Sequence, residues 1–251
     1  MVMDSVFFGK KFLVTGASSG IGKVTSLYLA NRGASIVGVD MDGDGLELLK
    51  SEFVSNHCSF LPIVKNLRDE DLEDVFESAT ANGVKLDGMV HCAGISGVLP
   101  LKLLNRAALQ KVMDINFCAF IELVRQYSKK KYSSGGAIVG ISSLAAVLPR
   151  AYELAYITSK AAMNAAIPCL AIELHSKNIR VNGIMPGIVK TSMITAQQSE
   201  EQRSFIENME KRTLLGAAQP ENIASVVAFL LSDGSKMITG RVIPVDGGLF
   251  L

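Results

Sequence analysis

The chain has 251 residues, of which 25 are basic and 24 acidic, so its formal net charge is +1. This balance excludes the strongly basic class of nucleic-acid or membrane-surface proteins, and we expect neither kind of partner. No apolar run reaches the roughly 18 residues of a membrane helix, no secretory signal is visible, and the four cysteines lack metal-ligand spacing, so we expect a cytoplasmic chain without a metal site.

The predicted elements alternate between strand and helix along the whole chain. In order they are strand 12–14, helix 22–31, strand 36–39, helix 45–55, strand 60–64, helix 69–81, strand 88–91, helix 106–131, strand 137–141, helix 156–176, strand 179–184, helix 220–231 and strand 242–245. This alternation predicts an α/β, Rossmann-like doubly wound fold, with a seven-stranded parallel sheet and helices on both faces. We expect one NAD(P)-binding domain over residues 1–251, with a substrate lid at about 191–215.

A glycine-rich turn follows the first strand directly. Gly16, Gly20 and Gly22 are spaced Gly-x-x-x-Gly-x-Gly, and a helix begins at the last of them. Glycines allow close approach of the backbone to a pyrophosphate, and the free amides of a helix N-terminus favour its negative charge. The spacing differs from the Gly-x-Gly-x-x-Gly fingerprint, so a plain glycine-rich loop is the alternative to cofactor binding.

Asp40 ends the second strand, where an acidic residue can bind the adenosine ribose hydroxyls and repel a 2′-phosphate. Neither Ala17–Ser19 nor Met41 supplies a basic side chain that could receive such a phosphate. This pattern favours NAD, with NADP as the alternative cofactor. Because Asp42 and Asp44 make the same turn acidic, Asp40 is alternatively an ordinary surface carboxylate.

Tyr156 and Lys160 are four residues apart at the start of a predicted helix, so both side chains project from one face. A nearby ammonium group should lower the pKa of a phenol, which could then exchange a proton with a carbinol. Ser143 follows the fifth strand and can bond a substrate oxygen, while Asn116 lies inside the preceding helix. Tyr156 with Lys160 alone is a weak signal, because such pairs also arise by chance.

Together these residues resemble the short-chain dehydrogenase/reductase family in its single-domain form of about 250 residues. The resemblance covers nearly the whole chain and rests on the order and spacing of the turn at 15–22, Asp40, Ala93-Gly94, Asn116, Ser143, Tyr156, Lys160, Pro186-Gly187, Thr191 and the closing Val245-Asp246-Gly247-Gly248. Each motif is weak by itself, but the set is specific.

The resemblance implies roles for these residues. Tyr156 would be the general acid/base, Lys160 would hold the nicotinamide ribose and tune Tyr156, Ser143 would position the substrate oxygen, and Asn116 would kink its helix and support a water molecule. The implied cofactor contacts are Gly16, Ser18, Ser19, Gly20, Ile21, Gly22, Asp40, Asn66, Leu67, Cys92, Ala93, Gly94, Tyr156, Lys160, Pro186, Gly187, Val189 and Thr191.

The sequence departs from the family pattern at several positions. His91-Cys92 replaces the usual Asn-Asn before Ala93-Gly94, so His91 needs a different partner, and Cys92 is expected to be a small packed residue. Asn66 stands where an aspartate is common. Pro168 should kink the helix three turns beyond Tyr156. None of these changes removes a group of the catalytic set.

The function predicted first is an NAD(H)-dependent oxidoreductase that acts on a secondary alcohol or ketone. The alternative is a 3-oxoacyl-[acyl-carrier-protein] reductase, against which Asp40 counts, and a non-catalytic nucleotide-binding regulator is the third possibility. Residues 94–100, 144–153 and 191–215 should select the substrate, and Leu144, Val147, Leu148, Met193 and Ile194 predict an apolar pocket. The resemblance also implies a homotetramer, with Ala161, Ala162, Ala165 and Ala166 on a helix-packing surface.

Overall fold

The computed structural model describes residues 6–53, 59–69, 71–191 and 200–251. Seven parallel strands form one sheet in the order β3-β2-β1-β4-β5-β6-β7. The strands are β1 (Lys11–Thr15), β2 (Ser35–Asp40), β3 (Phe60–Val64), β4 (Leu86–His91), β5 (Ser133–Ile141), β6 (Ile179–Pro186) and β7 (Val242–Val245). The doubly wound, Rossmann-like fold is therefore confirmed.

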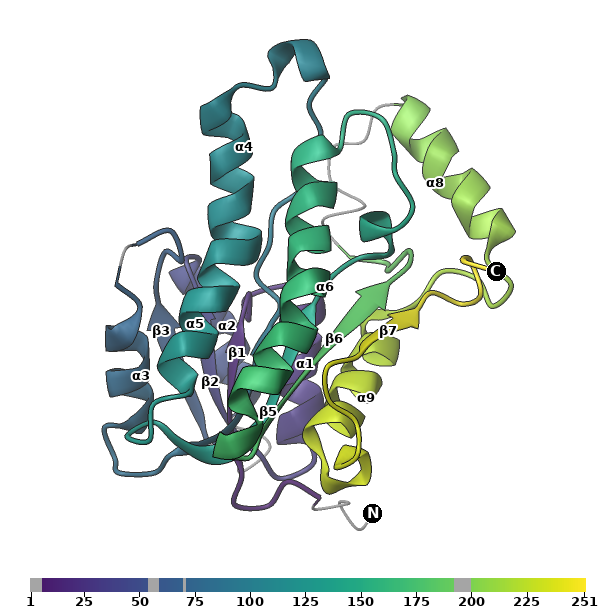
Figure 1. Cartoon of the computed structure of the whole chain (residues 1–251). Helices are drawn as coiled ribbons and strands as arrows, with labels where there is room; N and C mark the ends of the chain where they lie inside the picture. Colours follow the sequence, from purple (N-terminus) through teal and green to yellow (C-terminus); the bar gives the residue numbers. More distant parts are fainter. Residues whose placement is uncertain (1–5, 54–58, 70, 192–199) are drawn as a thin grey trace.

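Helices cover both faces of this sheet (Figure 1). One face carries α3 (Glu73–Thr80), α5 (Ala119–Tyr127) and α6 (Leu154–Leu174), and the other carries α1 (Gly20–Ala30), α2 (Gly43–Phe53) and α9 (Pro220–Leu231). Alternate residues of each strand enter the two cores: Leu13 packs with the first set, and Phe12 and Val14 pack with the second. Burial on both faces explains why the strands are continuously apolar.

The helix expected over 106–131 differs from the observed structure. It is divided into α4 (Arg106–Met113), a π-helical turn η3 (Asp114–Cys118) and α5, which ends at Tyr127. The wider turn interrupts the regular helical bonding pattern at Asn116, as single π turns often do near functional residues. The kink expected at Asn116 is therefore present as a local widening of the helix.

The predicted lid falls partly outside the described residues. Residues 192–199, including Met193 and Ile194, are not described, and α8 (Glu200–Arg212) follows them. Pro168 lies inside α6, as expected from the sequence. Among the helices that the structure describes, none combines the length and apolarity required to cross a membrane.

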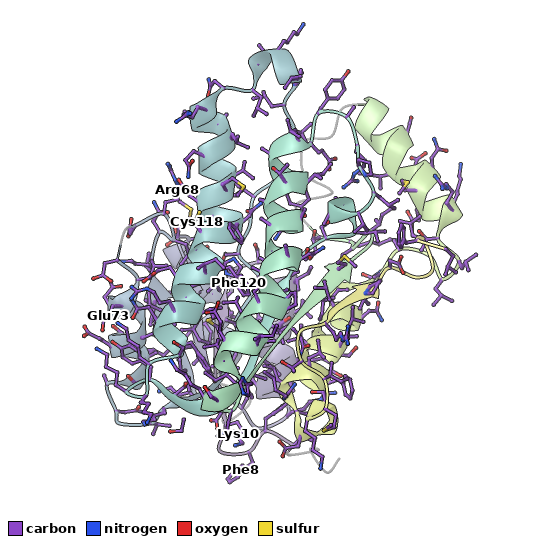
Figure 2. The ribbon with its side chains drawn as sticks, in the orientation of Figure 1. Phe8, Lys10, Arg68, Glu73, Cys118 and Phe120 are labelled. Carbon is purple, nitrogen blue, oxygen red and sulfur yellow. The ribbon has the colours of Figure 1, made fainter. Side chains whose placement is uncertain are left out.

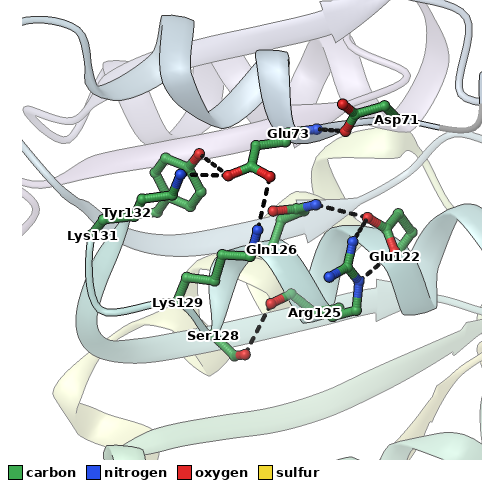
Figure 3. A network of polar contacts seen from close by, with 9 residues as sticks. All are labelled: Asp71, Glu73, Glu122, Arg125, Gln126, Ser128, Lys129, Lys131 and Tyr132. Carbon is green, nitrogen blue, oxygen red and sulfur yellow. Dashed lines mark hydrogen bonds and ion pairs between the residues drawn. The ribbon is translucent and has the colours of Figure 1, made fainter.

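Figure 3 shows a polar network that joins α3 to the connection between α5 and β5. The Glu73 carboxylate accepts hydrogen bonds from Lys131, from Lys129 at 2.9 Å and from the Tyr132 hydroxyl at 2.9 Å. These bonds lower the pKa of Glu73 to about 2. Two of the three consecutive lysines at positions 129–131 therefore link the connection between α5 and β5 to α3.

The Glu73 network predicts a pH-dependent contribution to stability. Because the pKa of Glu73 lies below its usual value, the contribution is present above about pH 4.5 and is lost as the pH falls toward 2. We expect Glu73→Gln to lower the melting temperature at pH 7 by a few degrees and to approach the wild type in acid. Thermal unfolding at several pH values tests this, with the exposed Glu77→Gln on the same helix as control. A loss that persists unchanged at pH 3 would contradict it.

Candidate active site

A cavity opens at the carboxyl ends of β1 and β4, where the strand order reverses direction. Ligands of doubly wound sheets bind at this switch point. The lining comes from four strand ends, from the π turn and from Thr191: Gly16, Ser18, Ser19, Gly20, Ile21, Gly22, Val39, Asp40, Met41, Lys65, Asn66, Leu67, Cys92, Ala93, Gly94, Ile95, Ile115 and Thr191. The structure thus brings together in one cavity most of the residues expected to contact a cofactor.

The glycine turn packs its backbone too closely for side chains at two of its glycines. A Cβ atom at Gly22 would lie 2.0 Å from the Gly16 carbonyl oxygen, and one at Gly16 would lie 2.8 Å from the Ala93 backbone nitrogen. Helix α1 starts directly after Ser19, whose side chain does not cap it. The uncapped amides and the bare backbone of this turn fit the pyrophosphate of a dinucleotide.

Asp40 faces the same cavity and is held in place by the glycine turn. One carboxylate oxygen accepts hydrogen bonds from the Ser18 backbone nitrogen at 3.0 Å and hydroxyl at 2.8 Å, and the other accepts from the Asp42 nitrogen at 3.1 Å. Lys65 also lines the cavity, but its ammonium group is paired with Asp74 at 2.7 Å and Asp69 at 3.4 Å. The negative charge of Asp40 therefore dominates this end of the cavity.

Ser143, Tyr156 and Lys160 lie together beyond the Gly94 end of the cavity. The Ser143 hydroxyl lies close enough to the Tyr156 phenol to lower its pKa, and the Lys160 ammonium is 5.9 Å from the centre of the Tyr156 ring. Lys160 is 4% exposed and donates a hydrogen bond to the Ile141 carbonyl oxygen at 2.8 Å. A Cβ atom at Gly94 would lie 3.4 Å from the Lys160 nitrogen, so the lysine adjoins the cavity wall.

Burial governs the ionisation of both groups in the cofactor-free chain. Desolvation raises the pKa of Tyr156, and the nearby Ser143 hydroxyl and the charge of Arg150 oppose that rise only in part. Desolvation also lowers the pKa of Lys160 to about 8. The sequence predicts a lowered tyrosine pKa, but in this state burial makes the phenol more firmly protonated than in water, and the Lys160 ammonium bonds the Ile141 carbonyl oxygen.

Asn116 is fully buried in the π turn and connects two parts of the site. Its amide oxygen accepts a hydrogen bond from the Ile95 nitrogen at 2.8 Å, and its amide nitrogen donates to the Ile95 oxygen at 3.0 Å. The same nitrogen contacts the Ser159 hydroxyl at 2.9 Å. Asn116 therefore ties the loop after β4 to α6, between Tyr156 and Lys160.

The remaining expected residues lie around this centre. Pro186 ends β6, the Gly187 nitrogen bonds the Val245 oxygen at 3.1 Å, and Val189 pairs with Ala218, so these three lie outside the cavity wall. Cys92 lines the cavity, and burial raises the pKa of its thiol to about 12. A thiol that stays protonated suits the expected packing role.

Comparisons with known proteins cover nearly the same residues. A family model described as Enoyl-(Acyl carrier protein) reductase matches residues 16–250. The chain is 34% identical to the 3-oxoacyl-[acyl-carrier-protein] reductase FabG of Thermotoga maritima, covering 97% of this chain and 98% of that protein. It is 33% identical to the L-xylulose reductase of Caenorhabditis elegans, covering 96% of each.

Solved structures agree with this relationship. A short-chain type dehydrogenase/reductase from Mycobacterium ulcerans superposes with a TM-score of 0.89 at 31% identity, covering 97% of this chain and 90% of that chain. The chain belongs to the short-chain dehydrogenase/reductase family. Another structure, 7α-hydroxysteroid dehydrogenase complexed with NADH and 7-oxo glycochenodeoxycholic acid, has a TM-score of 0.91 at 28% identity and covers 99% and 97%.

Family membership makes this chain an oxidoreductase that acts on CH–OH groups with a nicotinamide cofactor. Sequence analysis nevertheless missed several residues of the site in this family member. Val39, Met41, Lys65, Ile95 and Ile115 also line the cavity. All five are direct sequence neighbours of expected residues, which was the available signal. No sequence pattern indicates that Ser159 belongs to the site, because its contact with Asn116 exists only in the folded chain.

The burial of Lys160 should lower the free energy of unfolding of the protein at neutral pH. Its folded pKa of about 8 lies below the usual 10.5, so the folded state is penalised below pH 8, and the penalty disappears as the pH rises toward 10.5. We expect Lys160→Met to raise the free energy of unfolding at pH 7 by about 1–2 kcal/mol, net of the lost bond to Ile141, while activity falls. Denaturant unfolding at pH 7 and pH 10 tests this.

The gain from Lys160→Met should shrink between those two pH values. Lys50→Met, at an exposed position of α2, is the matched control and should change neither stability nor its pH dependence appreciably. A destabilised Lys160→Met protein at pH 7 would contradict the desolvation argument.

Proposed function

We propose that the chain transfers a hydride between NAD(H) and a secondary alcohol or ketone, with Tyr156 as the general acid/base. The observation that carries this proposal is the placement of Ser143 and Lys160 beside Tyr156, beyond the Gly94 end of a cavity that fits a dinucleotide. A hydroxyl and a phenol that lie side by side can both turn toward one substrate oxygen.

The proton chemistry follows from the state of these side chains. In ketone reduction the Tyr156 hydroxyl donates its proton to the substrate oxygen, and in alcohol oxidation the phenolate takes it back. The Ser143 hydroxyl holds that oxygen in place. The bound nicotinamide supplies or accepts the hydride. Because burial keeps the phenol protonated in the cofactor-free chain, Tyr156 starts as a proton donor.

Lys160 is poised to assist in both directions. Its pKa of about 8 leaves the ammonium charged at neutral pH yet close to the point of proton loss. Such a group can stabilise a phenolate and hold the nicotinamide ribose through hydrogen bonds. The negative charge that forms on Tyr156 would in turn favour the ammonium form of Lys160.

The cofactor that the site favours is NAD(H). Asp40 points its carboxylate into the cavity at the end of β2, where it can accept hydrogen bonds from ribose hydroxyls and would repel a 2′-phosphate. Lys65 is the cation lining this cavity, and its charge is balanced by Asp74 and Asp69. The other residues that we propose for cofactor contact are those that the family resemblance implies.

The substrate class that fits best is an apolar or amphipathic alcohol or ketone. Val98 and Leu101 are exposed on the loop after β4, and Val147 and Tyr152 are exposed on the loop before α6. The Leu99 nitrogen donates a hydrogen bond to the Tyr152 oxygen at 2.6 Å, so the two loops face each other across the entrance to Tyr156. Leu144 is buried beneath them.

The second candidate is reduction of a 3-oxoacyl group on a carrier protein. The matched family model and the Thermotoga maritima relative favour it, and an apolar entrance would also accept an acyl chain. Asp40 instead favours an NADH-linked dehydrogenase activity. A non-catalytic role is the least favoured, because the chain retains Asn116, Ser143, Tyr156 and Lys160, with Ser143 and Lys160 near Tyr156 and Asn116 bonded to Ser159 of the same helix.

We further propose a cytoplasmic homotetramer. The cysteines that the structure describes, Cys92, Cys118 and Cys169, are free thiols, which suits a reducing compartment. The small residues 161, 162, 165 and 166 lie at least partly exposed on α6, next to the exposed Ile172. Such a surface supports close helix packing between subunits.

Tyr156→Phe should reduce kcat by about 10²–10⁴-fold, because it removes the transferable proton and little else. Binding of NADH, followed by its fluorescence, should remain within a few-fold of the wild type. The assay is NADH oxidation or NAD reduction over a panel of steroid, cyclic, polyol and 3-oxoacyl substrates. Tyr152→Phe changes an exposed tyrosine and is the control; this variant should keep the wild-type kcat. Full activity of Tyr156→Phe would refute the mechanism.

Asp40→Asn removes the charge but keeps an oxygen that can accept the bonds from Ser18. We expect the ratio of kcat/KM for NADH over NADPH to fall by about tenfold or more, the equivalent of roughly 1.4 kcal/mol. Asp44→Ser, in the first turn of α2, should leave the ratio unchanged. If the wild type already prefers NADPH, the cofactor proposal fails and the carrier-protein alternative gains support.

A further inference from the structure

The loop after β4 carries apolar residues that face solvent. Leu101 and Leu103 lie in the short turn η2 (Leu101–Leu103) and are 75% and 57% exposed. Figure 1 shows this turn at the top of the view, beyond the start of α4 and of α6. The Leu103 and Leu104 nitrogens donate hydrogen bonds to the Pro100 oxygen at 2.8 and 3.1 Å. An ordered, projecting turn therefore presents the two leucines to solvent.

Three cations accompany these leucines, and no acidic residue lies in the same segment. Lys102, Arg106 and Lys111 are exposed, and residues 88–113 contain no aspartate or glutamate. Among the described residues, none of the three cations forms a salt bridge. The near-zero net charge of the whole chain hides this local excess. The surface, here called the basic tip, consists of Leu101, Lys102, Leu103, Arg106 and Lys111.

The acidic residues nearest to the basic tip along the chain and on the adjacent loop do not cancel its charge. The Asp114 carboxylate accepts a hydrogen bond from Gln110 at 2.6 Å and pairs with Arg68 at 3.6 Å. Figure 2 shows Arg68 at the side of this helix, away from η2. On the loop before α6, Glu153 is paired with Arg150 at 2.9 Å. Both carboxylates are thus balanced by other cations, and the basic tip keeps its positive charge.

The basic tip adjoins the active-site cavity at both of its ends. Ile95, which precedes it in the chain, and Ile115, which follows it, both line the cavity. The Leu99 nitrogen bonds the Tyr152 oxygen at 2.6 Å, which holds this loop beside the loop before α6. A surface that binds the basic tip therefore lies next to the entrance to Tyr156.

Exposed leucines mixed with lysine and arginine are typical of segments that bind the interface of an anionic bilayer. The apolar side chains enter the boundary between head groups and acyl chains, and the cations are attracted to the negative surface. A projecting turn suits this role, because lipids rearrange around it, whereas a protein partner has to supply a matching groove.

We propose that the basic tip is a docking surface for an anionic lipid bilayer. Docking brings the entrance of the active site to the membrane, where an apolar or amphipathic alcohol or ketone accumulates. The binding itself is independent of the proposed function, whereas the supply of substrate from the bilayer rests on it.

The chain contains no tryptophan, so an introduced tryptophan reports on a single position. Leu101→Trp keeps an apolar side chain in the basic tip, and Met237→Trp, at a residue that is 89% exposed, is the matched control. The probes are vesicles of phosphatidylcholine, with or without an equal amount of phosphatidylserine. We expect Leu101→Trp to show blue-shifted emission, and quenching by brominated acyl chains, with the phosphatidylserine vesicles only. Met237→Trp should respond to neither.

Charge reversal separates the basic tip from the net charge of the protein. Lys102→Glu/Leu103→Asp should weaken co-sedimentation with phosphatidylserine vesicles by about tenfold or more, because each cation near such a surface contributes about fivefold. Lys236→Glu/Met237→Asp makes the same change of net charge at another exposed lysine and apolar residue, and should bind like the wild type. Wild-type binding should also fall at high salt, which screens exposed charges. Melting temperatures check the folding of each variant.

The possible occupants of the basic tip give different results. The proposal is overturned if the wild type does not bind phosphatidylserine vesicles, if the two double variants bind equally, or if Leu101→Trp emission does not respond. It is also overturned if Lys102→Glu/Leu103→Asp dissociates the oligomer in sedimentation velocity, which assigns the tip to contacts between copies of the chain. A loss confined to turnover of carrier-protein substrates, without vesicle binding, assigns it to an acidic protein instead.

The failure of this proposal is distinguishable from the failure of the proposed function. Vesicle binding is measured without cofactor or substrate, so it gives the same answer whether or not Tyr156→Phe retains activity. Full activity of Tyr156→Phe contradicts the proposed function alone.

Discussion

The parallel pairing of β1 with β4 is the constraint on which the rest of the structure depends. The chain winds outward in opposite directions from these two strands, so their carboxyl ends open the crevice that the cofactor needs. Thr15 pairs with His91 in register, and the backbone of Cys92 bonds the Thr15 oxygen at 3.2 Å. The glycine turn and the loop at Gly94 are thereby brought together on opposite sides of one cavity.

The free-energy cost of burying ionisable groups is concentrated near the carboxyl ends of β4 and β5. Lys160, Tyr156 and His91 are all removed from water there, and burial shifts the pKa of each in the direction that favours its neutral form. The charged network around Glu73 lies on a distant edge of the sheet and remains in contact with solvent (Figure 3). The Glu73 ion pairs are thus separate from the residues whose ionisation the proposed chemistry uses.

The sequence determined the fold because the strands are short apolar runs at regular intervals, and all seven are present in the expected order. It could not show the π turn, since one extra residue within the helix expected over 106–131 barely changes its apolar periodicity. The pKa of Tyr156 is raised rather than lowered in the cofactor-free chain, because the spacing of Tyr156 and Lys160 shows that they are near but not how deeply the phenol is buried. No motif marks Lys65, which lines the cavity as the neighbour of Asn66.

The bond between Leu99 and Tyr152 bears on which parts of the chain tolerate substitution. It joins the loop after β4 to the loop before α6, and Tyr152 adopts a left-handed backbone conformation with φ of 68°. Neither residue belongs to the two buried cores. Substitutions in these loops can therefore leave the folded framework intact, and under the proposed function they can alter the substrate without changing the catalytic residues.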